Sequence, residues 1–146
     1  MGRIVVEALL KEPLASDVIV EDLFFGALAV CQRLEDVRPD ALILVGAAAR
    51  GREPGAVVRR EVEPAEMPIV QMQSAVGEAA TGYVSIDLIL EVATAFHALP
   101  RRTTVIEIEP ATTGPSDTLS PVGLLAVPVA IDLIRREIAA LAMSPP

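Results

Sequence analysis

The chain has 146 residues, which is enough for one domain with a sizeable core, and we expect a single domain over residues 1–146. Apolar residues make up 52% of the sequence, which argues against disorder. A formal net charge of −8 excludes the basic surface that nucleic acids require. One cysteine and one histidine exclude an intrachain disulfide and a metal site built from several such residues.

The apolar run over residues 122–131 is too short to cross a bilayer, and charges interrupt the first residues before an apolar stretch long enough for a signal peptide, so we expect none. We therefore expect a cytoplasmic protein that binds neither nucleic acid nor membrane.

The first part of the chain alternates short β-rich runs with amphipathic stretches, which is typical of an α/β fold. Residues 4–12 fit a helix, because Glu7 and Lys11 are four apart, but they also fit the start of a strand. The further elements predicted here are a strand at 17–22, a helix at 26–37 and a central strand at 41–45.

The second part continues the alternation. The strand predicted at 56–62 carries Arg59, Arg60 and Glu61, which is typical of a sheet edge. Residues 63–82 hold prolines and glycines without periodicity and are predicted as a long loop. The remaining predicted elements are a helix at 85–98, a strand at 103–109 and a final helix capped by Ser120. Pro128 lies inside that last helix, so we expect either a kink there or a later start of the helix.

These elements predict the fold class: an α/β, three-layer fold with a mostly parallel sheet and one antiparallel edge strand. The parallel strands are expected at 17–22, 41–45 and 103–109, and the edge strand at 56–62.

Acidic residues stand where the predicted strands end. In open α/β sheets ligands bind beyond the carboxyl ends of the strands, where Glu21, Asp22 and Glu109 lie. Glu107 is two residues before Glu109, so both side chains point to one face of their strand. Such carboxylates can hold a divalent cation through oxygen ligands. For any single residue, a solvated strand end or a helix cap is the more common role.

An ordered series of segments carries a resemblance. A strand that ends in an aspartate is followed by a helix, LILVGA, RGREPGAVV, a helix, TTVIEIEPAT and LSPVGLLAVP. From about residue 18 to residue 138 this series resembles the hydrogenase maturation proteases. The resemblance implies a small α/β protein that binds the nickel of a [NiFe]-hydrogenase large subunit and removes its C-terminal extension.

The departures from the family pattern fall on the metal site. The family's metal-binding aspartate falls on Gly46, and its metal-binding histidine falls on or near Gly82. His97 cannot replace that histidine, because about fifteen residues of helix place it roughly 22 Å further along. These departures from the family pattern imply that nickel binding of the family type is lost, and we expect no cofactor.

Three acidic positions remain as candidates. Asp22 and Glu109 match acidic positions of the family, whereas Glu107 stands where the family tends to have glycine. Carboxylates alone prefer hard ions such as magnesium to nickel.

The family's first strand and its G-x-G-N loop have no counterpart if residues 1–12 are the end of the helix that follows that loop. An alternative alignment puts residues 3–10 on the first strand and residues 13–17 on the loop. It leaves too few residues before Leu42 for the helix and the strand that follow the loop in the family. Without a central strand the sheet has open edges, and we expect a homodimer that covers them.

The changed ligand positions favour a catalytically degenerate relative that acts as a binding or accessory module in [NiFe]-hydrogenase maturation. Its expected partner is the large subunit or the C-terminal peptide of that subunit. The alternatives are an active endopeptidase that removes the extension, and an interaction protein unrelated to hydrogenase.

Overall fold

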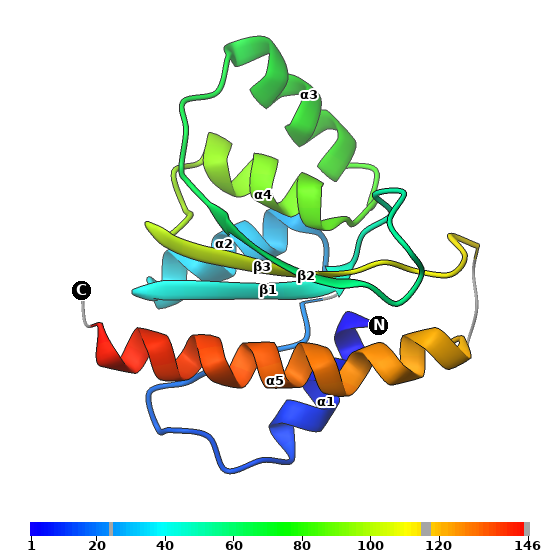
Figure 1. The fold of residues 1–146 in the computed structure, drawn as a ribbon. Coiled ribbons are helices and arrows are strands. Elements are labelled where there is room, and N and C mark those ends of the chain that lie inside the picture. Colours follow the sequence, from blue (N-terminus) through cyan, green and yellow to red (C-terminus); the bar gives the residue numbers. More distant parts are fainter. Residues whose placement is uncertain (24, 115–117, 145–146) are drawn as a thin grey trace. The chain divides into compact units, whose positions relative to one another are not determined.

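The computed structural model describes residues 1–23, 25–114 and 118–144 and has eight regular elements in this part of the chain (Figure 1). In chain order they are α1 (Gly2–Leu10), α2 (Ala27–Val37), β1 (Ala41–Ala47), β2 (Val57–Val62), α3 (Ile69–Ala79), α4 (Ile86–Ala95), β3 (Arg102–Ile108) and α5 (Pro121–Met143). The chain forms two compact units. The first comprises Met1–Asp22, Ile43–Arg60 and Val105–Pro146, and the second comprises Leu23–Leu42 and Glu61–Thr104.

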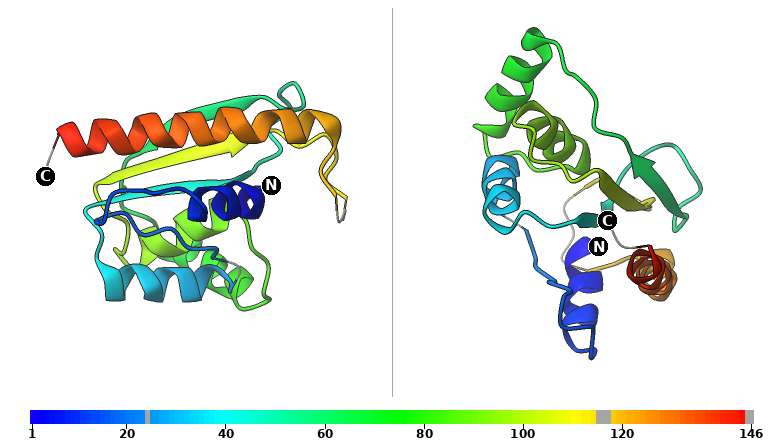
Figure 2. Two further views of the ribbon diagram at one scale, coloured as in Figure 1. Left: turned by 90° about the horizontal axis from the view of Figure 1, so that it is seen from below. Right: turned by 90° about the vertical axis from the view of Figure 1, so that its left-hand side faces the viewer.

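The first unit has an aliphatic core in which α1 and α5 pack side by side (Figure 2). Val5 of α1 and Ala130 of α5 are fully buried, as are Ile106 and Ile108 of β3. Because side chains alternate along a strand, the residues between and after these isoleucines point away from that core.

The second unit is helical. Helix α4 packs against α2 and α3, and Val92 and Ala93 of α4 are fully buried. The hydroxyl of Ser85 accepts a hydrogen bond from the backbone N–H of Leu88, which caps the start of α4 where the sequence predicts it.

The strands form one sheet in the order β1-β3-β2. Strands β1 and β3 run in the same direction and β2 runs opposite to them (Figure 1). The α/β class is thus confirmed, but the expectation of a mostly parallel sheet is wrong, because the sheet is small and mixed.

Residues 17–22 do not form the predicted strand. The backbone N–H of Val18 bonds to the carbonyl of Ala15 in a turn, and the side chain of Val20 packs on the core of the first unit. A β-rich run becomes a strand only where a neighbouring strand can pair with it. In the described part of the chain, β1 has β3 as its one strand neighbour.

Helices form in two segments for which the sequence predicted an ambiguous element and a long loop. Residues 2–10 form α1, stabilised on its exposed side by an ion pair between Arg3 and Glu7 four residues apart. The long loop predicted at 63–82 instead contains α3. Pro68 takes the N-cap position there, where its missing N–H removes no helical hydrogen bond, and one interior glycine costs only about 1 kcal/mol.

Helix α5 begins at the predicted place. The Ser120 hydroxyl accepts a hydrogen bond from the N–H of Gly123, and Pro121 occupies the first turn. The helix continues through Pro128 to Met143, so it does not start late. Figure 1 shows α5 as one continuous helix. Among the residues that the structure describes, no helix is long and apolar enough to cross a membrane.

Candidate functional site

A buried glutamate lies in β3, within the first unit. Glu107 is 0% exposed, although its neighbours Ile106 and Ile108 belong to an aliphatic core. Strand alternation turns Glu107 away from that core, toward the same face as Glu109, which is 4% exposed. A carboxylate buried to this extent is stable only when its charge is compensated by specific partners.

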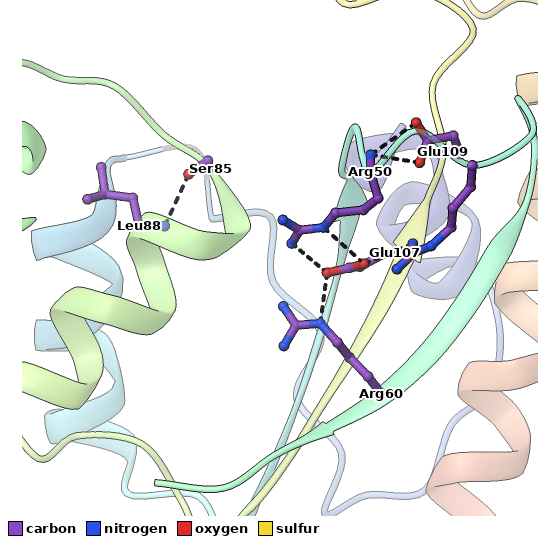
Figure 3. Close-up of polar contacts among 7 residues, drawn as sticks. Arg50, Arg60, Ser85, Leu88, Glu107 and Glu109 are labelled. Carbon is purple, nitrogen blue, oxygen red and sulfur yellow. Dashed lines mark hydrogen bonds and ion pairs between the residues drawn. The ribbon is translucent and has the colours of Figure 1, made fainter. Parts of the chain in front are cut away.

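Three arginines provide that compensation. Glu107 accepts hydrogen bonds from Arg50 Nε at 3.3 Å and Nη2 at 2.8 Å, from Arg52 Nη1 at 3.0 Å, and from Arg60 Nε at 2.8 Å. Figure 3 shows Arg50 and Arg60 converging on the carboxylate. Each carboxylate oxygen accepts two bonds, so the lone pairs of Glu107 are fully used. We call these four residues the arginine–glutamate cluster.

The cluster joins three segments of the first unit. Arg50 and Arg52 lie between β1 and β2, Arg60 lies on β2, and Glu107 lies on β3. Arg60, which the sequence suggests as a charge on an edge strand, is therefore paired with a buried group. Its neighbour Arg59 is paired as well, with Glu137 of α5, at 2.6 Å.

The arginines keep Glu107 ionised. Burial by itself raises the pKa of this carboxyl group, but the hydrogen bonds from Arg50, Arg60 and Arg52 outweigh burial and lower the pKa to about 2. At neutral pH the group is a carboxylate whose charge is matched by guanidinium groups.

Glu109 is engaged by the same segment. Both of its carboxylate oxygens accept from the backbone N–H of Arg50, at 3.1 and 2.9 Å (Figure 3). Its own backbone N–H bonds to the carbonyl of Ala56, and its carbonyl accepts from Gly55. Glu107 of β3 and Glu109 directly after the strand therefore fix the course of the chain between β1 and β2.

Gly46 lies at the same end of the sheet. The N–H of Ala48 bonds to the carbonyl of Ile108 at 3.1 Å, so Ala48 lies beside Glu109 in the parallel pairing of the two chain segments. Two residues earlier on each segment, Gly46 lies beside Glu107. The start of α1 is close by, since a Cβ built on Gly2 would lie 2.6 Å from the carbonyl oxygen of Val45. Gly46 thus supplies no side chain, and the acidic group at this point comes from β3 instead of β1.

The other two candidate positions are also explained locally. Asp22 lies 3.6 Å from Arg3 of α1, in an ion pair within the first unit. Gly82 belongs to the second unit and has a φ of 85°, a backbone conformation that favours glycine.

These residues do not fit a nickel ion. Within the described residues no group of three or more histidine, cysteine, aspartate and glutamate side chains could hold a metal. A cation at Glu107 would have to displace hydrogen bonds from three guanidinium groups and withstand their charge.

Sequence reasoning identified Glu107 and Glu109 but missed their arginine partners. The signal was present: a glutamate inside the apolar run TVIEI requires a buried counter-charge, and RGR follows the central strand. The pairing itself joins residues 47 to 57 positions apart, which a local pattern does not specify.

No protein-family model matches the sequence, and no curated protein is detectably similar to it. Several solved structures are similar in fold, and three of them are hydrogenase maturation peptidases or endopeptidases by name. The hydrogenase maturating endopeptidase HybD from E. coli has a TM-score of 0.66 and 23% identity, over 98% of this chain and 83% of that one. The hydrogenase 2 maturation peptidase from a Thaumarchaeota archaeon has a TM-score of 0.64 and 21% identity, over 94% and 86%.

The third is the solution structure of an endopeptidase from Escherichia coli, with a TM-score of 0.62 and 21% identity over 98% of this chain and 83% of that one. At these identities the likeness concerns the fold. It agrees with the architecture that the sequence resemblance implies: the chain has the fold of the hydrogenase maturation endopeptidases.

Proposed function

We propose that this protein is a binding or accessory module of [NiFe]-hydrogenase maturation that holds its partner without cleaving it. The observation that carries the proposal is the arginine–glutamate cluster, in which the carboxylate at the end of β3 is saturated by three guanidinium groups. A carboxylate in that state has no lone pair left for a metal ion.

The surroundings support the same conclusion. Glu109 is bound by the Arg50 amide, Asp22 is paired with Arg3, and Gly46 has no side chain. Three oxygen or nitrogen ligands cannot be reduced to one without losing most of the affinity for a transition metal. A peptidase that recognises its substrate through nickel would lose recognition and chemistry together.

The likeness in fold supports the choice of partner that we propose. Two of the similar structures are named hydrogenase maturation peptidases, so the proposed partner is a hydrogenase large subunit or its C-terminal peptide. We place the protein in the cytoplasm, where it would meet that subunit.

The test is incubation of the purified protein with a large-subunit precursor that carries its C-terminal extension. We expect the precursor to be retained by the immobilised protein, while mass spectrometry shows the extension intact. The same subunit lacking the extension is the control, and it should bind more weakly if the C-terminal peptide is recognised.

Two outcomes would overturn the proposal. Clean removal of the extension would show that the protein is an active endopeptidase. Failure to bind the precursor would leave only an interaction protein unrelated to hydrogenase.

A further inference from the structure

The side chain of Arg52 uses only part of its hydrogen-bonding capacity within the arginine–glutamate cluster. It donates to Glu107 through Nη1, at 3.0 Å, and it makes no other hydrogen bond to the part of the chain that the structure describes. The N–H groups of Nε and Nη2 lie on one edge of a guanidinium group, and that edge can bind both oxygens of a carboxylate. Because the side chain is 30% exposed, part of it is accessible to a ligand.

Glu107 fixes the position of this guanidinium group. The carboxylate is fully buried and is also held by Arg50 and Arg60, so the end of the Arg52 side chain is ordered before a ligand arrives. An arginine that is already anchored loses less side-chain entropy when it binds a further group. Next to it, a Cβ built on Gly51 would meet no atom of the described chain within 4 Å, which shows open space beside the backbone at this point.

Positive charge exceeds negative charge in this part of the first unit. Three guanidinium groups share the one carboxylate of Glu107. When Glu109 is counted as well, because its carboxylate binds the backbone N–H of Arg50, three positive charges stand against two negative ones. The whole chain has a net charge of −8. A local positive site on an acidic protein suits a single small anionic group, whereas the rest of the surface repels a polyanion.

We propose that Arg52 is a carboxylate-binding residue, whose Nε and Nη2 groups donate to the two oxygens of a carboxylate on the partner. The identity of that partner rests on the proposed function, so the carboxylate belongs to an acidic side chain or to the chain terminus of the large subunit's C-terminal peptide. An unmodified peptide offers no other anionic group that fits the planar guanidinium edge. A lysine at this position would supply the charge without the two parallel bonds.

The first test needs no partner. The ¹⁵N-labelled protein is titrated with sodium acetate, and in parallel with sodium chloride at the same ionic strength, while the Nε–H signals of the arginine side chains are followed by NMR. We expect a saturable shift of the Arg52 signal with acetate alone. The control is Arg101, an exposed arginine without a hydrogen bond or ion pair to the described residues, whose signal should respond equally to both salts.

The second test measures binding of a synthetic peptide with the sequence of the C-terminal extension. We expect Arg52→Gln and Arg52→Lys each to raise the dissociation constant at least about tenfold, because bonds to a charged group are lost. Arg101→Gln should leave it unchanged. Since Arg50 and Arg60 still hold Glu107, the Arg52 variants should stay folded, which circular dichroism checks. A peptide with an amidated C-terminus separates the two sources, because it binds more weakly only if the chain terminus is the bound group.

The carboxylate site and the proposed function fail in different ways. An Arg52 signal that does not respond to acetate, or that responds no more than the Arg101 signal, would overturn the carboxylate site. Wild-type binding of the peptide that Arg52→Gln leaves unchanged would also overturn it, while the proposed function would stand. A wild type that responds to acetate at Arg52 but binds neither peptide nor precursor would support the site and overturn the proposed partner.

Discussion

Replacing Glu107 with glutamine is expected to lower the free energy of unfolding by about 3 kcal/mol at pH 7. The substitution keeps the shape of the side chain but removes the one negative charge that Arg50, Arg52 and Arg60 share. Removing one partner of a buried ion pair typically costs 3–5 kcal/mol, and the low end applies because the arginine side chains are about one-third exposed.

Urea denaturation of Glu107→Gln and the wild type measures this difference. The matched control is Glu66→Gln, which makes the same chemical change at an exposed position and should alter the free energy of unfolding by less than about 0.5 kcal/mol. Equal losses for the two variants would show that the cluster does not stabilise the fold.

Acid should remove the same stabilisation. The pKa of Glu107 is lowered from 4.5 to about 2 in the folded protein, so the unfolded chain takes up this proton first as the pH falls. The contribution of Glu107 is fully present above about pH 4.5 and is lost as the pH falls through about 2. A pKa difference of this size between the folded and unfolded chain corresponds to about 3 kcal/mol of unfolding free energy.

The measurement is the difference in unfolding free energy between the wild type and Glu107→Gln, followed from pH 7 to pH 2. We expect the difference to be constant at neutral pH and to shrink steadily below pH 4.5. Since both proteins share every other titrating group, a difference that does not change with pH would contradict the lowered pKa.

The elements that the sequence predicts well are those with one dominant apolar pattern. The unbroken apolar run at Ala41–Ala47, the β-rich run at Arg102–Ile108 and the capped helix that starts after Ser85 all form near their predicted bounds. In each of them, local preference and tertiary packing demand the same structure.

The failures come from partners that lie outside the local sequence. Residues 17–22 have strand character but pack Val20 on the core without pairing to a strand. Helix α3 forms in a proline-bounded segment because α4 offers a surface to pack on. Both cases depend on neighbours that periodicity does not reveal.

The candidate site also has a part that the sequence predicts and a part that depends on the tertiary structure. Strand alternation correctly places Glu107 and Glu109 together, and both contact Arg50. The choice between a metal ion and guanidinium groups as the counter-charge depends on how the segment between β1 and β2 folds back over β3. That choice is a property of the tertiary structure.

The central claim is that guanidinium groups occupy the carboxylate at the end of β3 and leave no site for nickel. Calorimetric titration of the metal-free protein with Ni²⁺ tests it most directly. The account predicts no saturable heat at micromolar protein concentrations. Nickel binding of micromolar or tighter affinity that Asp22→Ala abolishes would contradict it.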